Sequence, residues 1–510
     1  MNPAQTARRS WFRDPAALTI GLAVLALHAA CAGRYDVFRD ELYFIVCGRH
    51  PAFGYVDQPP LVPLLAAGTY ALGAQTWLLR LPAVLAAGGL VWLAVAFVRL
   101  LGGRAGAAWT AAIAVGFAPM FMALTATLNT TTFELLAWTA IAYALARAAL
   151  LDDGRALLWG GAVAGVALEA KYALASWLIA LALGVALTPQ RRLFARKELW
   201  LGLALAAVIA APSIVWQALH GWPFAELVAA AHGKDADTPA LAFLVNQMFV
   251  MNPLLAPVWI AGVVAPFVRS ELSGLRFLAI AFVAQTALTI ATHGKDYYLA
   301  AAYPTVFVLG GVFWEGVVRA AAPRAAYLAA AVALSIVVAP IALPVLPPAT
   351  LAVYQRALHL APQAQEKAAA SAVLPQMFSD ELGWHDFVRE VAAAYDAIPP
   401  AQRASTAIVA ANYGEAGAID VYGGAYGLPP ALAGHNQYYV WGLRGQKPRN
   451  VLRLGWDAPA TMRRYCGDVR VLGAASSRYA MPYENAVTFT YCAGIRPSLA
   501  ALWPRVKFYE

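Results

Sequence analysis

Long apolar runs separated by short polar gaps are the feature of this sequence that most limits how the chain can fold. About 20 predominantly apolar residues are enough for a helix to cross the hydrocarbon core of a bilayer. Such runs fill the first two thirds of the 510 residues, and the mean hydropathy of the chain is +0.58. We therefore predict an α-helical polytopic membrane protein. About 11 transmembrane helices are expected, near residues 15–33, 80–98, 106–123, 129–149, 156–172, 173–188, 199–219, 246–267, 276–292, 297–318 and 325–346.

The Lys and Arg residues predict the orientation of these helices, because cytoplasmic loops carry an excess of basic residues. With a cytoplasmic N-terminus, the basic residues of the cytoplasmic segments outnumber those of the outer loops, as at Arg8, Arg9 and in the cluster 191–197. The net charge of +9 is therefore attributed to topology. It does not indicate a nucleic-acid-binding surface, because the basic cluster is flanked by apolar runs on both sides.

The stretch 61–79 is apolar enough to span a bilayer but contains Pro63, Gly68 and Gly73. If it spanned, every later loop would change sides and the basic clusters would face outward. We therefore predict an interfacial or re-entrant helix on the outer face.

After Pro347 the sequence changes to a mixed polar and apolar pattern. A helical stretch at 363–395 and strand-like runs at 406–410, 450–454 and 487–491 predict a C-terminal α/β domain outside the cytoplasm. The predicted domains are 1–346, a transmembrane catalytic domain with an outer loop at 34–79, and 347–510, a soluble domain. Cys466 and Cys492 both fall in this second domain, where a disulfide and two buried thiols are equally compatible with the sequence.

The first outer loop concentrates acidic residues near a membrane interface, at Asp36, Asp40, Glu41 and Asp57. Such carboxylates can accept a proton from an attacking hydroxyl, hold a divalent cation or bind a cationic substrate. The alternative is a solvated acidic loop without chemistry. The pair Pro59 and Pro60 fixes the backbone after Asp57 and favours a shaped loop.

Lysines at the predicted outer ends of two helices are candidates for binding a lipid phosphate. Lys171 and Lys295 occupy such positions, and Tyr297 and Tyr298 add hydroxyl donors. The alternatives are snorkelling of the lysines to the interface and, for Lys295 with Asp296, a solvated turn. His293 is a candidate metal ligand on the same face.

Several segments together resemble the GT-C glycosyltransferases of the protein mannosyltransferase and lipid A aminoarabinose transferase type. In that family an Asp-Glu pair follows the first helix and a second motif ends in Pro-Pro-Leu, as here at 59–61. Further segments similar to the family are Glu169-Ala-Lys-Tyr172, Pro212-Ser-Ile-Val-Trp-Gln217, His220-Gly-Trp-Pro223, Gly294-Lys-Asp-Tyr-Tyr-Leu299, Asn412-Tyr-Gly-Glu-Ala-Gly417 and Gly434-His-Asn-Gln-Tyr-Tyr439.

The resemblance implies a GT-C fold and an inverting transfer of a sugar from a polyprenyl-phosphate carrier to an acceptor outside the cytoplasm. The acceptor could be lipopolysaccharide, another glycan, a lipid or a protein. It also implies a multi-pass protein of the cell inner membrane with a periplasmic C-terminal domain. The absence of a GxxxxGK motif from the sequence agrees with a lipid-linked donor rather than a nucleotide donor.

The resemblance also suggests roles for individual residues. Asp40 is the candidate general base, and Glu41 would position it or bind a cation. Asp57 matches an acidic position that could ligate a metal or bind substrate, which makes a divalent metal ion a candidate cofactor. The aminoarabinose transferases have a Lys where this chain has Gln58, so a phosphate contact there would lose its charge. Further candidate substrate-binding residues are Lys171, Tyr172, Lys295, Asp296, Tyr297 and Tyr298.

Two other functions are alternatives to glycosyl transfer. A transporter or flippase of lipid-linked sugars is the main alternative, but the sequence lacks the inverted repeats with broken helices that many transporters show. A non-catalytic sensor with an external ligand-binding domain is the other. Neither function requires the acidic loop.

Overall fold

The computed structural model describes residues 11–234, 238–360, 372–455 and 459–510. The chain divides into two compact units. The first, which we call the bundle unit, comprises residues 1–34, 77–215 and 236–345. The second, the sheet unit, comprises residues 35–76, 216–235 and 346–510. The segment that follows the first helix thus belongs to the same unit as the C-terminal region.

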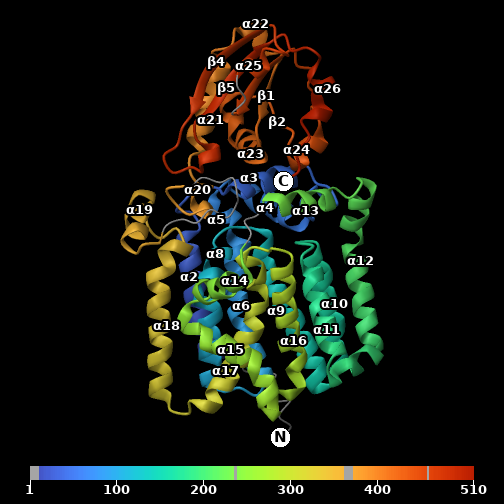
Figure 1. The fold of residues 1–510 in the computed structure, drawn as a ribbon, viewed down its shortest axis with the longest axis vertical. Coiled ribbons are helices and arrows are strands. Elements are labelled where there is room, and N and C mark those ends of the chain that lie inside the picture. The colour runs from blue at the N-terminus through green and yellow to red at the C-terminus, as the bar shows by residue number, and fades with distance from the viewer. Residues whose placement is uncertain (1–10, 235–237, 361–371, 456–458) are drawn as a thin grey trace. The chain divides into compact units, whose positions relative to one another are not determined.

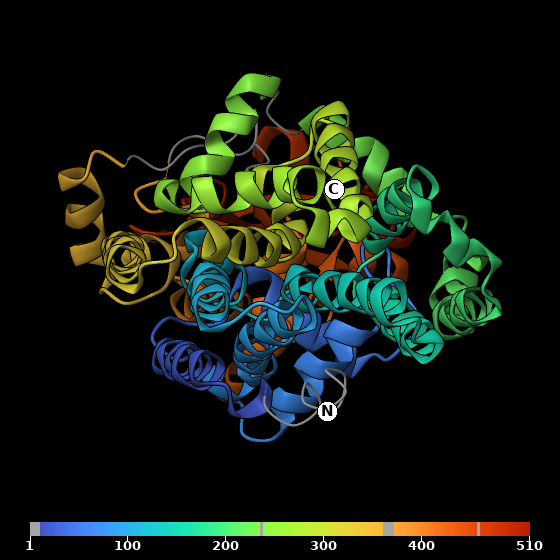
Figure 2. The same ribbon diagram turned by 90° about the horizontal axis from the view of Figure 1, so that it is seen from below.

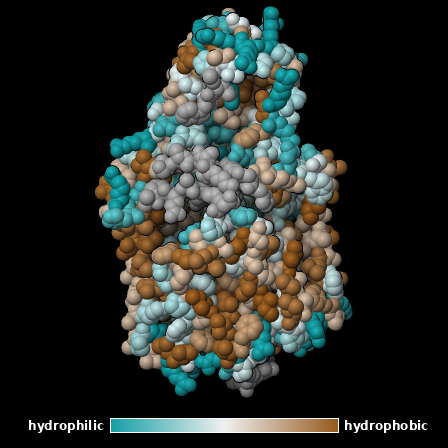
Figure 3. Space-filling model, in the orientation of Figure 1, coloured by the Kyte–Doolittle hydropathy of each residue, from teal (hydrophilic) through white to brown (hydrophobic). Residues whose placement is uncertain are grey.

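The bundle unit consists of helices, which Figure 1 shows from the side and Figure 2 along their axes. Their apolar residues cover much of the unit's surface in Figure 3, as expected for helices in lipid. Buried aromatic residues pack between them, as in the stacked pair Trp138 and Trp177, whose ring centroids lie 5.2 Å apart. The main helices are α2 (Pro15–Cys31), α6 (Leu81–Leu100), α7 (Ala105–Phe117), α8 (Pro119–Leu124), α9 (Thr130–Leu151), α10 (Gly154–Leu168), α11 (Leu174–Ala186), α12 (Lys197–Leu219), α14 (Ala240–Val250), α15 (Ala256–Val268), α16 (Arg276–Ala291), α17 (Tyr303–Val317) and α18 (Ala321–Ala342).

Six helices among the described residues are long and apolar enough to cross a membrane, and up to eight if each bent pair counts as one span. Shorter apolar helices, including α2, α7 and α10, accompany them. The chain is therefore a polytopic α-helical membrane protein, as the sequence predicted. The expected number of about 11 spans is not reproduced by these counts.

The single span predicted at 246–267 is wrong in shape because it contains a bend, whereas the helix predicted at 173–188 is present as α11 and bends only where it ends. Helix α11 is bent by 114° against the 3-10 helix η2 (Pro189–Ala195), and α14 is bent by 97° against the helical segment Pro253–Val268. In both cases a proline begins the second segment, where its missing N–H and fixed φ favour the start of a new helix over continuation of the old one. Similarly, Pro119 separates α7 from α8.

The sheet unit begins with α3 (Arg39–Arg49) and α4 (Leu61–Ala71). Helix α4 has 11 residues and would rise about 16 Å, which is too short to span the hydrocarbon core. Its location at an interface stays a prediction. The other helices of the unit are α13 (Pro223–Lys234), α19 (Pro348–Ala357), α20 (Gln376–Ser379), α21 (Trp384–Asp396), α22 (Pro400–Arg403), α23 (Tyr413–Tyr422), α24 (Asn436–Trp441), α25 (Pro459–Met462) and α26 (Leu499–Leu502).

A five-stranded mixed sheet organises the C-terminal part, in the order β2-β1-β3-β5-β4. The interior strand β1 is buried along its whole length, in agreement with its mostly apolar sequence Thr-Ala-Ile-Val-Ala. It pairs in parallel with β2 and β3, whereas β5 pairs antiparallel with β3 and β4. The strands are β1 (Thr406–Ala410), β2 (Leu432–Ala433), β3 (Asn450–Gly455), β4 (Asp468–Ala475) and β5 (Val487–Ala493).

The α/β prediction for this region is confirmed, with differences in detail. The helix expected at 363–395 is reduced to α20 and α21, separated at Gly383, whose φ of +97° favours glycine. Residues 361–371 of that stretch lie outside the described residues. Cys466 and Cys492 form a disulfide with their Cα atoms 5.4 Å apart, which resolves the two alternatives that the sequence left open.

Candidate active site

The acidic pair lies at the start of α3 in the sheet unit, where the helix dipole favours negative charge. Glu41 is completely buried, and its Oε2 accepts a hydrogen bond from the backbone N–H of Phe38 at 2.8 Å. It thereby satisfies one of the donors left unpaired at a helix start. Asp40, one residue earlier, stays partly exposed. The neighbouring carboxylates therefore differ, since Glu41 stabilises the helix start whereas Asp40 remains accessible for chemistry.

The partner of Asp40 comes from the C-terminal region. Its Oδ1 accepts a hydrogen bond of 2.8 Å from the hydroxyl of Tyr413, the first residue of α23. Burial raises the pKa of Tyr413 well above its usual value, against the opposing charge of Arg39 and with further contributions from Asp40 and Asp57. The phenol therefore keeps its proton over the physiological range and acts as a donor to Asp40.

Asp57 is held by two donors. Its Oδ1 accepts a hydrogen bond from the hydroxyl of Tyr43 at 2.9 Å, and its Oδ2 accepts one from Nδ2 of Asn436 at 3.2 Å. Burial raises the pKa of Asp57 to about 7, with a further contribution from the charge of Asp40. This carboxyl can therefore exchange a proton near neutral pH. The adjacent Gln58 is buried, and within the described residues its Nε2 makes no hydrogen bond.

Two tyrosines connect the aspartates. The rings of Tyr43 and Tyr413 lie 4.7 Å apart between centroids, and each hydroxyl donates to one aspartate. The hydroxyl of Tyr43 also accepts a hydrogen bond from the backbone N–H of Gln437 at 3.1 Å. We call Asp40, Tyr413, Tyr43 and Asp57 the Asp-Tyr array.

A cation adjoins the array. The guanidinium carbon of Arg39 lies 4.6 Å from the ring centroid of Tyr413 and 5.2 Å from that of Tyr483. Arg39 also donates to the hydroxyl of Tyr483, which in turn donates to Asp380 at 3.0 Å. Burial raises the pKa of Asp380 to about 6 against the opposing effect of Arg39. Arg39 thus links Tyr413, the partner of Asp40, to Tyr483 and Asp380 in one partly buried network.

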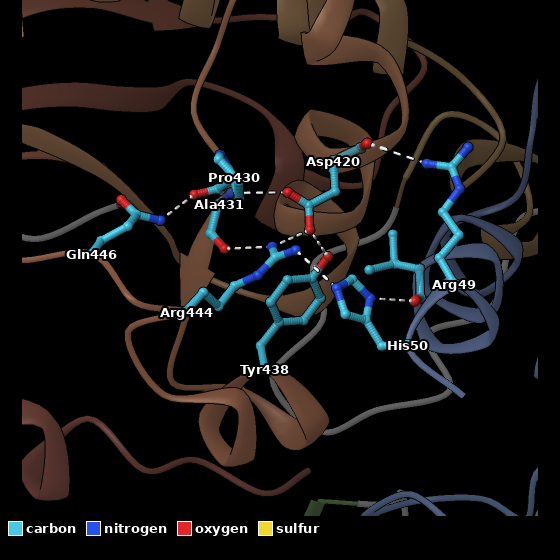
Figure 4. Close-up of polar contacts among 9 residues, drawn as sticks. Arg49, His50, Asp420, Pro430, Ala431, Tyr438, Arg444 and Gln446 are labelled. Carbon is cyan, nitrogen blue, oxygen red and sulfur yellow. Dashed lines mark hydrogen bonds and ion pairs between the residues drawn. The ribbon is translucent and has the colours of Figure 1, made fainter. Parts of the chain in front are cut away.

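The far end of α3 is fastened by a second network, shown in Figure 4. The carboxylate of Asp420 pairs with Arg444 and accepts hydrogen bonds from the Tyr438 hydroxyl at 3.1 Å and from the Ala431 N–H at 2.9 Å. Arg49, the last residue of α3, donates to the backbone carbonyl of Asp420 at 3.4 Å. Both ends of α3 are therefore tied to α23, which limits the movement of Asp40.

Sequence reasoning found the two aspartates but not the side chains that hold them. It pointed to 412–417 and 434–439 only as segments resembling a family, without assigning a role to Tyr413 or Asn436. Their separation from the acidic loop by more than 370 residues explains the omission. Arg39 was missed because its neighbours in sequence are acidic, and its aromatic partners are also distant.

In the bundle unit, Lys171 lies just after α10. Its Nζ donates hydrogen bonds of 2.9 Å to Oγ1 of Thr131 and to Oε2 of Glu134. The same ammonium lies 5.9 and 5.6 Å from the ring centroids of Tyr297 and Tyr298. Three of the residues predicted to bind a phosphate are thus brought together, although the charge of Lys171 is partly neutralised by Glu134.

The other predicted substrate residues of the bundle unit, Tyr172, Lys295 and Asp296, are sequence neighbours of this group. Tyr172 follows Lys171, and Lys295 precedes the 3-10 helix η5 (Asp296–Ala302). The Oδ2 of Asp296 accepts a hydrogen bond of 3.2 Å from Nδ2 of Asn246, so Asp296 is anchored rather than only solvated.

The residues present do not form a typical metal site. Within the described residues no group of three or more His, Cys, Asp or Glu side chains could hold a metal ion. Of the two predicted ligands, Asp57 belongs to the sheet unit and His293 to the bundle unit. Both carboxylate oxygens of Asp57 are already hydrogen bonded. We therefore assign no chemical step to a metal.

Residues 57–216 match the family model described as dolichyl-phosphate-mannose-protein mannosyltransferase. No curated protein sequence matches the chain.

Two solved structures share the fold. One is ArnT from Cupriavidus metallidurans bound to undecaprenyl phosphate, with a TM-score of 0.61 and 13% identity. The other is the same protein in the apo state, with a TM-score of 0.57 and 14% identity. Each match covers 93% of this chain and 97% of the other. The predicted resemblance to GT-C glycosyltransferases is confirmed, and the fold is of the GT-C type.

Proposed function

We propose that this chain is an inverting membrane glycosyltransferase that moves a sugar from a polyprenyl-phosphate donor to an acceptor hydroxyl or amine outside the cytoplasm. The observation that carries the proposal is the accessible carboxylate of Asp40, held by Tyr413, in a chain with the fold of an undecaprenyl-phosphate-bound protein. The chain would lie in the inner membrane with a cytoplasmic N-terminus and a periplasmic C-terminal domain at 347–510.

Asp40 acts as the general base in this proposal. Its carboxylate takes the proton of the acceptor group while the acceptor atom attacks the anomeric carbon of the donor sugar. The bond between that carbon and the phosphate oxygen breaks, and the electron pair leaves with the polyprenyl phosphate. Attack from the side opposite the phosphate inverts the configuration at the anomeric carbon.

The other residues support binding. Lys171, Tyr172, Lys295, Tyr297 and Tyr298 would neutralise the phosphate of the leaving group by charge and hydrogen bonds. Asp57 and Gln58 would bind the sugar or acceptor, and Glu41 would hold the helix that carries Asp40. Asp296 would fix the loop that follows Lys295.

Mass spectrometry of envelope lipids and glycans, in cells with and without the gene, tests the proposal. The expected result is that one glycan, lipid or protein loses a sugar when the gene is deleted and that the intact lipid-linked sugar accumulates. A flippase would instead change the side of the membrane on which the lipid-linked sugar resides. Purified protein that moves this lipid without forming a new glycosidic bond would contradict glycosyl transfer.

A further inference from the structure

We infer that Tyr413 is a positioning residue for the reaction, which fixes the orientation of Asp40 and makes the C-terminal region a working part of the active site. This inference rests on the proposed function, because it needs Asp40 to act as a base. Its direct basis is the hydrogen bond of 2.8 Å from the Tyr413 hydroxyl to Asp40 Oδ1.

The ring of Tyr413 is clamped on several sides. The Arg39 guanidinium lies 4.6 Å from its centroid, the Tyr43 ring 4.7 Å and the His435 ring 4.8 Å. The backbone of Tyr413 is also fixed, because Asn412 caps α23 by accepting hydrogen bonds from the next two helix residues, Gly414 and Glu415. The hydroxyl therefore has little freedom to leave Asp40.

Small residues in the same segment permit the close approach of α23 to α3. A Cβ atom at Gly414 would lie 2.6 Å from Cγ of Arg39, and one at Gly417 would lie 3.2 Å from Cβ of Leu42. Larger side chains at these positions would push α23 outward. The pattern Asn412-Tyr-Gly-Glu-Ala-Gly417 thus has a physical explanation, in which the cap and glycines bring the tyrosine to Asp40.

The contact has two consequences for a general base. It restricts the side-chain rotamers of Asp40, so that the carboxylate is prepared for the acceptor before the acceptor binds. It also stabilises the charged form, which is the form that accepts a proton. The other charged groups that act on this network are Arg39 from α3, Asp57 from the following loop, Asp380 at the end of α20 and Glu484 before β5. The titratable ring of His435 also packs against Tyr413.

The variant Tyr413→Phe removes the hydroxyl but keeps the ring between its neighbours. The matched control is Tyr422→Phe, because Tyr422 lies on the same helix and its hydroxyl donates to Asp36 of the same loop at 3.1 Å. Full-length variants in detergent are compared with the wild type and Asp40→Asn in sugar transfer from a polyprenyl-phosphate sugar, across a pH series. Thermal unfolding of each variant is measured in parallel.

For Tyr413→Phe we expect kcat to fall about tenfold or more, with little change in KM for the lipid donor. Without the donated hydrogen bond the carboxylate form is less favoured, so the acidic limb of the pH profile should move upward by about one pH unit. Tyr422→Phe should keep the wild-type profile. The hydroxyl of 3-fluorotyrosine is more acidic than that of tyrosine and is therefore a stronger donor of nearly the same shape. A protein with 3-fluorotyrosine at position 413 should retain activity, and the acidic limb of its pH profile should move to lower pH.

The outcomes separate this inference from the proposed function. If Asp40→Asn is inactive while Tyr413→Phe matches Tyr422→Phe in kcat and pH profile, Tyr413 does not position Asp40 and only the inference fails. If Tyr413→Phe does not fold, an unchanged pH profile for the 3-fluorotyrosine protein overturns the inference instead. If the wild type transfers no sugar, or Asp40→Asn transfers it normally, the proposed function fails and the inference fails with it.

Discussion

The ammonium of Lys171 lies 2.9 Å from Oε2 of Glu134, a carboxylate that is only 6% exposed. A buried carboxylate in a membrane protein needs such a partner, because an unpaired charge there is costly. With Thr131 and Glu134 as acceptors, Lys171 uses two of its three N–H donors. The lysine proposed to bind the donor phosphate is thus also the counter-ion of Glu134.

Single and double substitutions separate these two roles of Lys171. If it binds the donor phosphate, Lys171→Gln should raise KM for the polyprenyl-phosphate sugar about tenfold or more. Glu134→Gln keeps the ammonium and should leave that KM near the wild-type value. A purely structural pair would instead lower thermal stability in both single variants, with recovery in the double variant and no change in KM.

Because the pKa of Asp57 is raised in the folded state, we predict that the stability of the sheet unit depends on pH. Burial raises its pKa from the unfolded value of 3.8 to about 7. Below pH 3.8 the carboxyl is protonated in both states, whereas between these values only the folded state keeps the proton. The stabilising effect of this group is therefore greatest at low pH and is lost as the pH rises through 7, at up to about 1.4 kcal/mol per pH unit.

Hydrogen exchange of α24, which carries Asn436, measures this effect in the intact protein. The free energy of opening should fall between pH 4 and 7 in the wild type. In Asp57→Asn, which cannot ionise at this position, the fall should be shallower. Asp36→Asn should retain the wild-type slope. Equal slopes in all three proteins would show that Asp57 does not hold a proton near neutrality.

The hydrogen bonds of Asp57 also predict the response to metal removal. Because Tyr43 and Asn436 already engage both of its oxygens, we expect the transfer activity of purified protein to be unchanged after EDTA treatment. A loss of activity that a divalent cation restores would return Asp57 to the role of a metal ligand.

The transmembrane class and GT-C fold could be predicted from the sequence because they depend on apolar runs and on motifs that are local in the chain. Bends were less predictable. Pro253 at a helix start and Pro340 inside α18 are both prolines in apolar stretches, yet only the first begins a new segment of a bent pair. Packing that the sequence does not display distinguishes them.

Of the candidate site, only the two aspartates could be predicted from the sequence. Asp40 and Asp57 stand close together in sequence and carry an evident chemistry. Tyr413 and Asn436 become part of the site through the packing of α23 and α24 in the same unit as α3, and nothing in the local sequence of the acidic loop specifies those contacts. The pairing of Lys171 with Glu134 could not be predicted for the same reason, since the two residues are 37 positions apart in the sequence and lie on different helical segments.

The most direct test of the central claim is the rate of sugar transfer by Asp40→Asn, with Asp36→Asn as a control from the same loop. The account predicts that Asp40→Asn retains its thermal stability but loses at least about 100-fold in kcat, while Asp36→Asn stays active. A folded Asp40→Asn protein that transfers sugar at the wild-type rate would contradict the assignment of Asp40 as the base.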